Sequence, residues 1–143
     1  MIYQKKRGKI KMKKQEKTEP LRWAVLGTGV IANQMAQALE KMDRPLYGVA
    51  NRTYEKAVNF ARKYGVEKIF PHYDAVFEDP AVDIVYITTP HNTHYPFMKK
   101  ALEHGKHLLV EKSITLNSRE LEEMRKLAEE NPTANWVILN GNR

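Results

Sequence analysis

The sequence predicts an α/β protein built on one doubly wound parallel sheet. Short apolar runs alternate along the chain with segments whose apolar residues recur every three or four positions, which indicates strands that alternate with amphipathic helices. The apolar runs are continuous, as in strands that helices cover on both faces. A chain of 143 residues has room for one domain of ordinary size.

Three strands and two helices are expected in the first half of the body, which starts at Leu21. The strands are residues 23–26, 46–50 and 68–70. Apolar positions of the first helix recur from Ile31 to Met42, and those of the second run from Ala57 to Tyr64. Gly65 stands where a glycine commonly ends a helix.

The second half repeats the alternation. Its expected strands are residues 84–87, 107–110 and 136–139, and a helix over 96–104 has proline in its first turn and Gly105 after its end. Asn117 and Glu120 have the spacing of a capping box in front of the last helix. Six parallel strands joined by right-handed crossovers suit the order 3-2-1-4-5-6, numbered along the chain, which is the Rossmann arrangement.

Composition excludes several classes of protein. The chain contains no cysteine, so disulfide frameworks, cysteine-ligated metal centres and thiol nucleophiles are excluded. No apolar run is long enough for a membrane-spanning helix, and no apolar segment of a secretory signal follows the basic N-terminus. A cytoplasmic location is the expectation that fits.

The net charge of +7 is concentrated in residues 1–20. This segment holds eight basic and two acidic residues, so residues 21–143 carry a net charge of only +1. We expect residues 1–20 to be a disordered basic arm, because they offer few apolar side chains to bury. Such an arm can bind phosphates, but the nearly neutral body argues against a nucleic-acid-binding protein. The other interpretation is that Met12 is the true initiator and that the residues before it are an extension of the sequence.

The motif with the clearest chemistry is the glycine-rich segment of residues 27–32, GTGVIA, which fits G-x-G-x-x-A. It follows the first expected strand and opens the first expected helix. Gly27 permits a tight turn, Gly29 lets a backbone approach a pyrophosphate, and Ala32 lets the helix pack closely. The helix N-terminus offers unpaired N–H groups to the phosphates. A glycine turn without a ligand is the alternative.

The end of the second strand bears on the choice of cofactor. A site for NAD usually has an acidic residue about 20 positions after the glycines. This chain has Asn51 and Arg52 there, and Arg52, helped by Lys56, can pair with the 2′-phosphate of NADP. We therefore expect NADP, with NAD as the alternative. The alternative interpretation is that Arg52 only stacks on the adenine or faces solvent.

Two further polar segments follow the fourth and fifth strands, at residues 88–94 (TTPHNTH) and 110–113 (VEKS). Ligands of open α/β sheets bind beyond the carboxyl ends of the strands, so both segments are expected near the nicotinamide. His91 and His94 have no clear third ligand, so we expect no metal site. His94 is expected to cap or pack at the following helix.

These residues resemble those of the Gfo/Idh/MocA oxidoreductases. The resemblance rests on AVLGTGVIA at residues 24–32, on Asn51-Arg52, and on TPHNTHYPFMKKALEHGKHLLVEK at residues 89–112, and it runs from about Leu21 to the end of the chain. It implies the N-terminal NAD(P)-binding domain of an enzyme that interconverts alcohols and carbonyls, commonly on sugars, cyclitols or related polyols. The residues expected to bind the cofactor are Gly27, Thr28, Gly29, Val30, Ile31, Asn51, Arg52, Lys56, Thr89, Pro90, His91, His94, Glu111 and Lys112.

The resemblance also implies a catalytic residue. The lysine of the family's E-K-P motif falls on Lys112, whose ammonium would polarise a carbonyl or stabilise an alkoxide. Glu111 would help to position this lysine and the cofactor ribose. The alternative for Lys112 is a solvated lysine at a strand end.

Two departures from the family's pattern affect the expected function. Ser113 replaces the proline of E-K-P, so the 112–113 bond is expected to be trans, since a cis bond there costs about 2.5–4 kcal/mol. The family continues into a second domain that provides substrate contacts and a catalytic histidine, and this domain is expected to be absent. The chain is then either the cofactor-binding part of an oxidoreductase or a non-catalytic nucleotide-binding remnant of a truncated or split gene. A full-length form is compatible with an oligomer.

Overall fold

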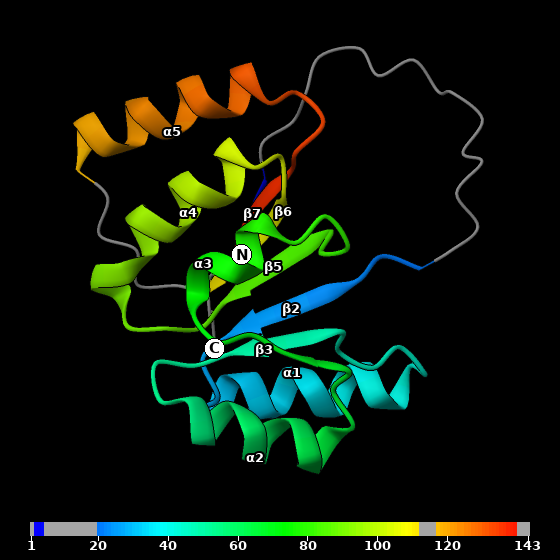
Figure 1. Cartoon of the computed structure of the whole chain (residues 1–143). Coiled ribbons are helices and arrows are strands. Elements are labelled where there is room, and N and C mark those ends of the chain that lie inside the picture. The colour runs from blue at the N-terminus through cyan, green and yellow to red at the C-terminus, as the bar shows by residue number, and fades with distance from the viewer. Residues whose placement is uncertain (1, 5–19, 112–116, 140–143) are drawn as a thin grey trace.

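The computed structural model describes residues 2–4, 20–111 and 117–139, and they form one sheet with helices on both faces (Figure 1). Six strands run parallel in the order β7-β6-β5-β2-β3-β4, which confirms the predicted order. The strands are β2 (Trp23–Leu26), β3 (Gly48–Ala50), β4 (Lys68–Ile69), β5 (Ile84–Ile87), β6 (His107–Glu111) and β7 (Trp136–Leu139).

Two groups of helices cover the two faces of the sheet (Figure 1). Helices α1 (Val30–Lys41) and α2 (Tyr54–Tyr64) lie on one face. Helices α3 (Tyr73–Glu78), α4 (His94–Glu103) and α5 (Ser118–Glu130) lie on the other. The doubly wound sheet predicted from the alternation of strands and helices is therefore confirmed.

Strand β2 shows why the central strands read as continuous apolar runs. Val25 packs into the apolar cluster under α1 and α2, whereas Ala24 and Leu26 pack into the cluster under α3, α4 and α5. All three residues have no exposed surface. Both faces of the strand are buried, so an alternation of apolar with polar residues cannot occur there.

The end signals predicted at Gly65, Gly105 and Asn117 agree with the structure. Gly65 ends α2 in the left-handed conformation with φ of 63°, and Gly105 follows α4 with φ of 68°. Before α5, the Asn117 side chain accepts a hydrogen bond from the Glu120 N–H at 2.8 Å, and the Glu120 carboxylate accepts one from the Asn117 N–H. The predicted capping box is therefore confirmed.

Helix α3 was not expected, and α4 begins two residues earlier than predicted. Only six residues long, α3 is too short for a recognisable helical stripe, and its N-cap is His72, whose Nδ1 accepts a hydrogen bond from the Ala75 N–H at 3.2 Å. Helix α4 begins at His94, so Pro96 is its third residue. Proline is tolerated there because the first N–H groups of a helix lack partners within it.

One part of the expected disordered arm differs from that expectation. Residues 2–4 form strand β1 (Ile2–Gln4), which pairs antiparallel with β7 at the edge of the sheet. The unpaired backbone groups of an edge strand provide a template for such pairing, and Ile2 and Tyr3 are good strand formers. All eight basic residues of the arm lie outside the described residues.

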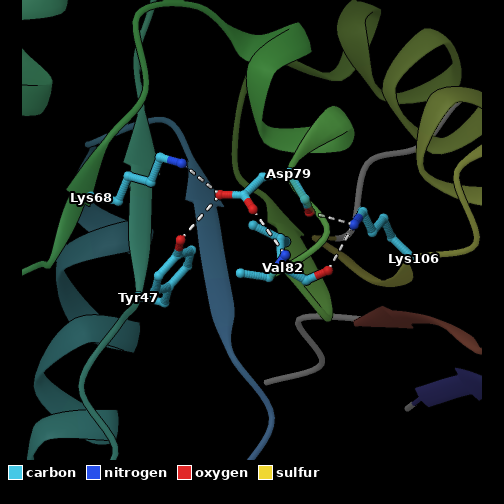
Figure 2. A network of polar contacts seen from close by, with 6 residues as sticks. Tyr47, Lys68, Asp79, Val82 and Lys106 are labelled. Atoms are coloured by element: carbon cyan, nitrogen blue, oxygen red, sulfur yellow. Dashed lines mark hydrogen bonds and ion pairs between the residues drawn. The ribbon is translucent and has the colours of Figure 1, made fainter.

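A polar network joins the amino ends of four strands (Figure 2). The Asp79 carboxylate accepts hydrogen bonds from Lys68 Nζ at 2.9 Å and from the Tyr47 hydroxyl at 3.1 Å. The Nζ of Lys106 donates to the carbonyl oxygens of Asp79 at 2.7 Å and Val82 at 2.9 Å. These contacts hold the segment between α3 and β5 at the edge of the sheet where β3, β4, β5 and β6 begin.

Within the described ranges, no helix is both long enough and apolar enough to cross a membrane.

Candidate functional site

The carboxyl ends of three neighbouring strands lie level and carry the glycine-rich turn. Leu26, the last residue of β2, pairs with Ala50 on one side and with Ile87 on the other. The chain crosses to opposite faces of the sheet on the two sides of β2, which is the arrangement that opens a crevice beyond the strand ends. The segments that begin at Gly27, Asn51 and Thr88 therefore meet at one edge.

Gly27 occupies a backbone position that requires glycine. Its φ is 100°, which side chains with a Cβ atom rarely allow, and its N–H donates a hydrogen bond to the carbonyl oxygen of Ala50 at 2.8 Å. A Cβ atom on Gly27 would stand 2.6 Å from Oγ1 of Thr88. The turn thus brings β2, β3 and the segment after β5 into close contact.

Gly29 is the N-cap of α1, and it leaves open space in front of the helix. A Cβ atom there would have no neighbour within 4 Å, and no acidic residue stands in the first turn of the helix. The Asn33 amide donates hydrogen bonds to the carbonyl oxygens of Thr28 at 3.1 Å and Gly29 at 2.8 Å, which fixes the turn. The unpaired N–H groups and the open space form a cradle that suits a phosphate group.

Asn51 links the end of β3 to this turn. Its Oδ1 accepts a hydrogen bond from the Thr28 hydroxyl at 3.2 Å, and its Nδ2 donates to the carbonyl oxygen of Thr53 at 3.1 Å. Arg52, between them, has an exposed side chain. The guanidinium is therefore free to meet a ligand at the surface of the site.

Hydroxyl groups organise the segment after β5. The hydroxyls of Thr89 and Thr93 lie 2.6 Å apart, and Thr93 also donates to the carbonyl oxygen of Pro90 at 2.5 Å. The short 3₁₀ helix η1 (His91–Thr93) leads directly into α4. His94, the first residue of α4, is buried with Nε2 2.7 Å from the carbonyl oxygen of Thr89, and burial lowers the pKa of its imidazole.

These three segments enclose a cavity of about 640 Å³, which we call the site cavity. Its size is that of an ordinary small-molecule or cofactor site. Eight of the residues expected to bind a cofactor line it: Gly27, Thr28, Gly29, Asn51, Arg52, Lys56, Thr89 and Pro90. Arg52 and Lys56 supply positive charge, and no carboxylate is found among the described lining residues.

Other expected residues lie away from the site cavity. Val30 is 73% exposed, and Ile31 packs against the apolar cluster under α1 and α2. His91 is exposed on η1, outside the lining. Neither His94 nor Glu111 lines it, and Glu111 accepts a hydrogen bond from the Tyr86 hydroxyl at 2.8 Å.

The expected catalytic residue, Lys112, lies outside the described residues, as does Ser113.

Sequence reasoning missed several residues that border the site cavity. Thr88, Asn92 and Thr93 stand in the segment that was expected near the nicotinamide, but none was singled out. Tyr73 also lines the cavity, from the unexpected helix α3. Burial raises the pKa of the Tyr73 hydroxyl, and a hydrogen bond from the Arg52 backbone partly offsets this effect.

Comparison with known proteins agrees with this geometry. Residues 21–138 match the model of an oxidoreductase family with an NAD-binding Rossmann fold, Gfo/Idh/MocA. Trans-1,2-dihydrobenzene-1,2-diol dehydrogenase from Mus musculus is 34% identical over 107 residues, which cover 73% of this chain and 32% of the mouse protein. The chain thus spans about a third of the length of the curated relatives it matches.

Solved structures show the same arrangement. An NAD-binding oxidoreductase from Klebsiella pneumoniae superposes with a TM-score of 0.76 at 27% identity, over 85% of this chain and 34% of that one. A 3-ketoreductase from Actinomadura kijaniata, in complex with NADP and TDP-benzene, gives a TM-score of 0.71 at 31% identity, over 79% of this chain and 35% of that one.

Proposed function

The chain belongs to the Gfo/Idh/MocA family of oxidoreductases, and from this membership we propose that it binds a nicotinamide dinucleotide in the site cavity, with a preference for NADP. We further propose that it is the cofactor-binding part of an enzyme that moves hydride between alcohol and carbonyl groups of a sugar, cyclitol or related polyol. The observation that carries the proposal is a cavity on the glycine turn that offers helix N–H groups and two cationic side chains.

Each part of the site cavity has a proposed role. The turn from Gly27 to Gly29 and the N-terminus of α1 hold the pyrophosphate through backbone N–H groups. Arg52 and Lys56 pair with the 2′-phosphate, where an acidic residue would repel it. Thr89 and Pro90 border the part of the cavity nearest the ends of β5 and β6, where the nicotinamide is expected.

Lys112 is the proposed catalytic residue. A bound nicotinamide supplies or accepts the hydride at the reacting carbon. The lysine ammonium would stabilise the negative charge that develops on the substrate oxygen, and Glu111, at the end of β6, would help to orient it. The carboxylate of Glu111 is already held by the Tyr86 hydroxyl, which supports a fixed orientation.

The second candidate is a nucleotide-binding protein without turnover of its own. The chain spans about a third of the length of the relatives it matches, and the features of the site cavity described above are those of nucleotide binding. Both candidates need the nucleotide, and only the first needs Lys112. A cytoplasmic location and an oligomeric state stay predictions.

Titration of the purified chain with NADPH and NADH, followed by nucleotide fluorescence and by thermal shift, tests the proposal. We expect saturable binding of both and tighter binding of NADPH. Absence of binding by either nucleotide would contradict it. A panel of polyols and sugars, assayed with and without a separately produced second domain of a relative, then separates the two candidates: turnover that Lys112→Ala abolishes supports the enzyme.

A further inference from the structure

A second hollow lies beside the site cavity, between α1 and α2. This α1–α2 recess measures about 480 Å³. It shares four lining residues with the site cavity, namely Thr28, Gly29, Asn51 and Lys56. The two hollows therefore adjoin at the glycine turn, and one ligand can extend from the first into the second.

The face of α2 toward the recess presents donors of hydrogen bonds. Lys56, Asn59 and Lys63 all line the recess, and their spacing of three and four residues places them one above another on the helix. Among the described residues, those that line the recess include these two lysines and no carboxylate. Its chemistry therefore suits a small group with more than one negative charge.

The ammonium of Lys63 is held in place. Its Nζ lies 3.3 Å from Oδ1 of Asn33 and 5.2 Å from the centre of the Tyr64 ring, over its face. Asn33 is fixed in turn, because it accepts a hydrogen bond from the Tyr64 hydroxyl at 2.5 Å and donates to the carbonyl oxygens of Thr28 and Gly29. Lys63 is thus tied to the turn that carries the cradle. It lies thirteen residues beyond the end of β3, near which the sequence placed the residues that choose the cofactor.

We propose that the α1–α2 recess completes the specificity subsite for the phosphate monoester on the adenosine ribose, and that Lys63 binds this 2′-phosphate together with Arg52 and Lys56. The inference rests on the proposed function, since it assumes that the dinucleotide lies over the glycine turn. A ribose placed above Gly29 and Asn51 would stand where the two hollows adjoin, and a substituent on its 2′ oxygen would then reach the recess. Arg52 borders the site cavity, Lys63 borders the recess and Lys56 borders both, so the three cations surround the place where the two hollows adjoin.

The test compares dinucleotide affinities of Lys63→Gln with those of the parent chain. We expect the Kd of NADPH to rise about three- to tenfold, the range for a charge-assisted contact at an exposed site, and the Kd of NADH to stay the same. Arg62→Gln is the matched control, because it removes the same charge from the same helix at a position that does not line the recess. Lys63→Arg, which keeps the charge, should retain most of the preference.

Smaller ligands identify what the recess binds. 2′-AMP should displace NADPH from the parent chain better than 5′-AMP does, and Lys63→Gln should remove the difference. Equal losses of NADPH and NADH affinity would overturn the proposal, because Lys63 would then only support the glycine turn. Unchanged affinities in Lys63→Gln would overturn it as well.

The same ligands separate this inference from the proposed function. If neither dinucleotide binds, the proposed function fails, and titration with 2′-AMP and with inorganic phosphate decides the inference. Binding of 2′-AMP that Lys63→Gln weakens would sustain the subsite. Binding of inorganic phosphate without discrimination between 2′-AMP and 5′-AMP would show a general anion site and would overturn the inference. Absence of binding by 2′-AMP, 5′-AMP and inorganic phosphate would overturn it too. A surface substitution should shift the melting temperature by only about a degree or two. A melting temperature of Lys63→Gln in this range confirms that the variant is folded.

Discussion

Oγ1 of Thr88 stands 2.6 Å from the point that a Cβ atom would occupy on Gly27, and the same hydroxyl donates a hydrogen bond to the carbonyl oxygen of Leu26 at 2.7 Å. The end of β5 is thereby bonded to the end of β2 across the turn. The close approach leaves no room for a side chain, so the glycine is required by packing as well as by its φ of 100°.

Gly27→Ala should therefore destabilise the fold. A residue with a Cβ atom in this conformation costs about 1–3 kcal/mol, and displacement of the Thr88 hydroxyl adds the loss of its hydrogen bond. Urea denaturation measures the free energy of unfolding. A decrease of less than about 0.5 kcal/mol would contradict the geometry.

Gly29→Ala should leave the stability of the fold intact but weaken dinucleotide binding. The φ of Gly29 is −80°, and the added methyl group meets nothing within 4 Å, so stability should be unchanged or slightly higher. The same methyl group projects into the cradle in front of α1. We expect the affinity for both dinucleotides to fall at least about tenfold, or 1.4 kcal/mol. Fluorescence titration measures the dinucleotide affinity, and urea denaturation measures the free energy of unfolding. Unchanged affinity would place the pyrophosphate elsewhere.

Arg52→Ala tests the predicted cofactor choice. The guanidinium is exposed at the end of β3, with no carboxylate among the described residues that line the cavity with it. Its removal should weaken NADPH binding about three- to tenfold and leave NADH binding nearly unchanged, because only NADP carries the 2′-phosphate. Equal affinities of the parent chain for the two dinucleotides would contradict the choice.

The repeat of strands and helices could be predicted from sequence because it depends on local patterns. Continuous apolar runs identify strands buried on both faces, as Val25 and its neighbours are, and Gly65 and Asn117 mark helix ends through their own backbone or side-chain chemistry. The glycine turn was also predictable, because its spacing and its position between strand and helix are both local.

Contacts between distant residues could not be predicted in this way. Asn33 and Tyr64 are 31 residues apart, and neither belongs to a motif, yet their hydrogen bond fixes the α1–α2 recess. Helix α3 carries Tyr73 into the site cavity, but six residues are too few to show a helical period. The hydrogen bonds that Lys106 donates over 24 and 27 residues have no local signal either.

Lys106→Met tests the network of Figure 2. Lys106 is only 7% exposed, and burial lowers the pKa of its ammonium. Methionine keeps most of the apolar stem but leaves the carbonyl oxygens of Asp79 and Val82 without their donor, so the free energy of unfolding should fall by about 1–3 kcal/mol. Lys41→Met, on the exposed end of α1, should change it by less than about 0.5 kcal/mol. Equal effects of the two substitutions in urea denaturation would show that the network adds nothing to the free energy of unfolding.

His94 should make stability depend on pH in the mildly acidic range. The imidazole is 2% exposed, and its Nδ1 has no hydrogen-bond partner among the described residues, so a proton there would bury both a charge and an unpaired donor. Burial is the main cause that lowers its pKa below 6.5; His91 lowers it further, while the contact with Thr89 and the charge of Glu111 act in the other direction.

The sign of the effect follows from which state binds the proton first. As pH falls through 6.5, the unfolded chain protonates this histidine before the folded chain does, so stability is lost from pH 6.5 down through the folded pKa. The loss has a slope of at most about 1.4 kcal/mol per pH unit. Asp74 and Asp79, whose pKa values are lowered from 3.8, act only at lower pH.

Urea denaturation at about pH 7.5 and about pH 5 should show this loss in the parent chain and in His91→Gln, where His94 is intact. His94→Gln should reduce it, because glutamine can donate to the Thr89 carbonyl but does not titrate; an equal loss in that variant would mean that another group binds the proton.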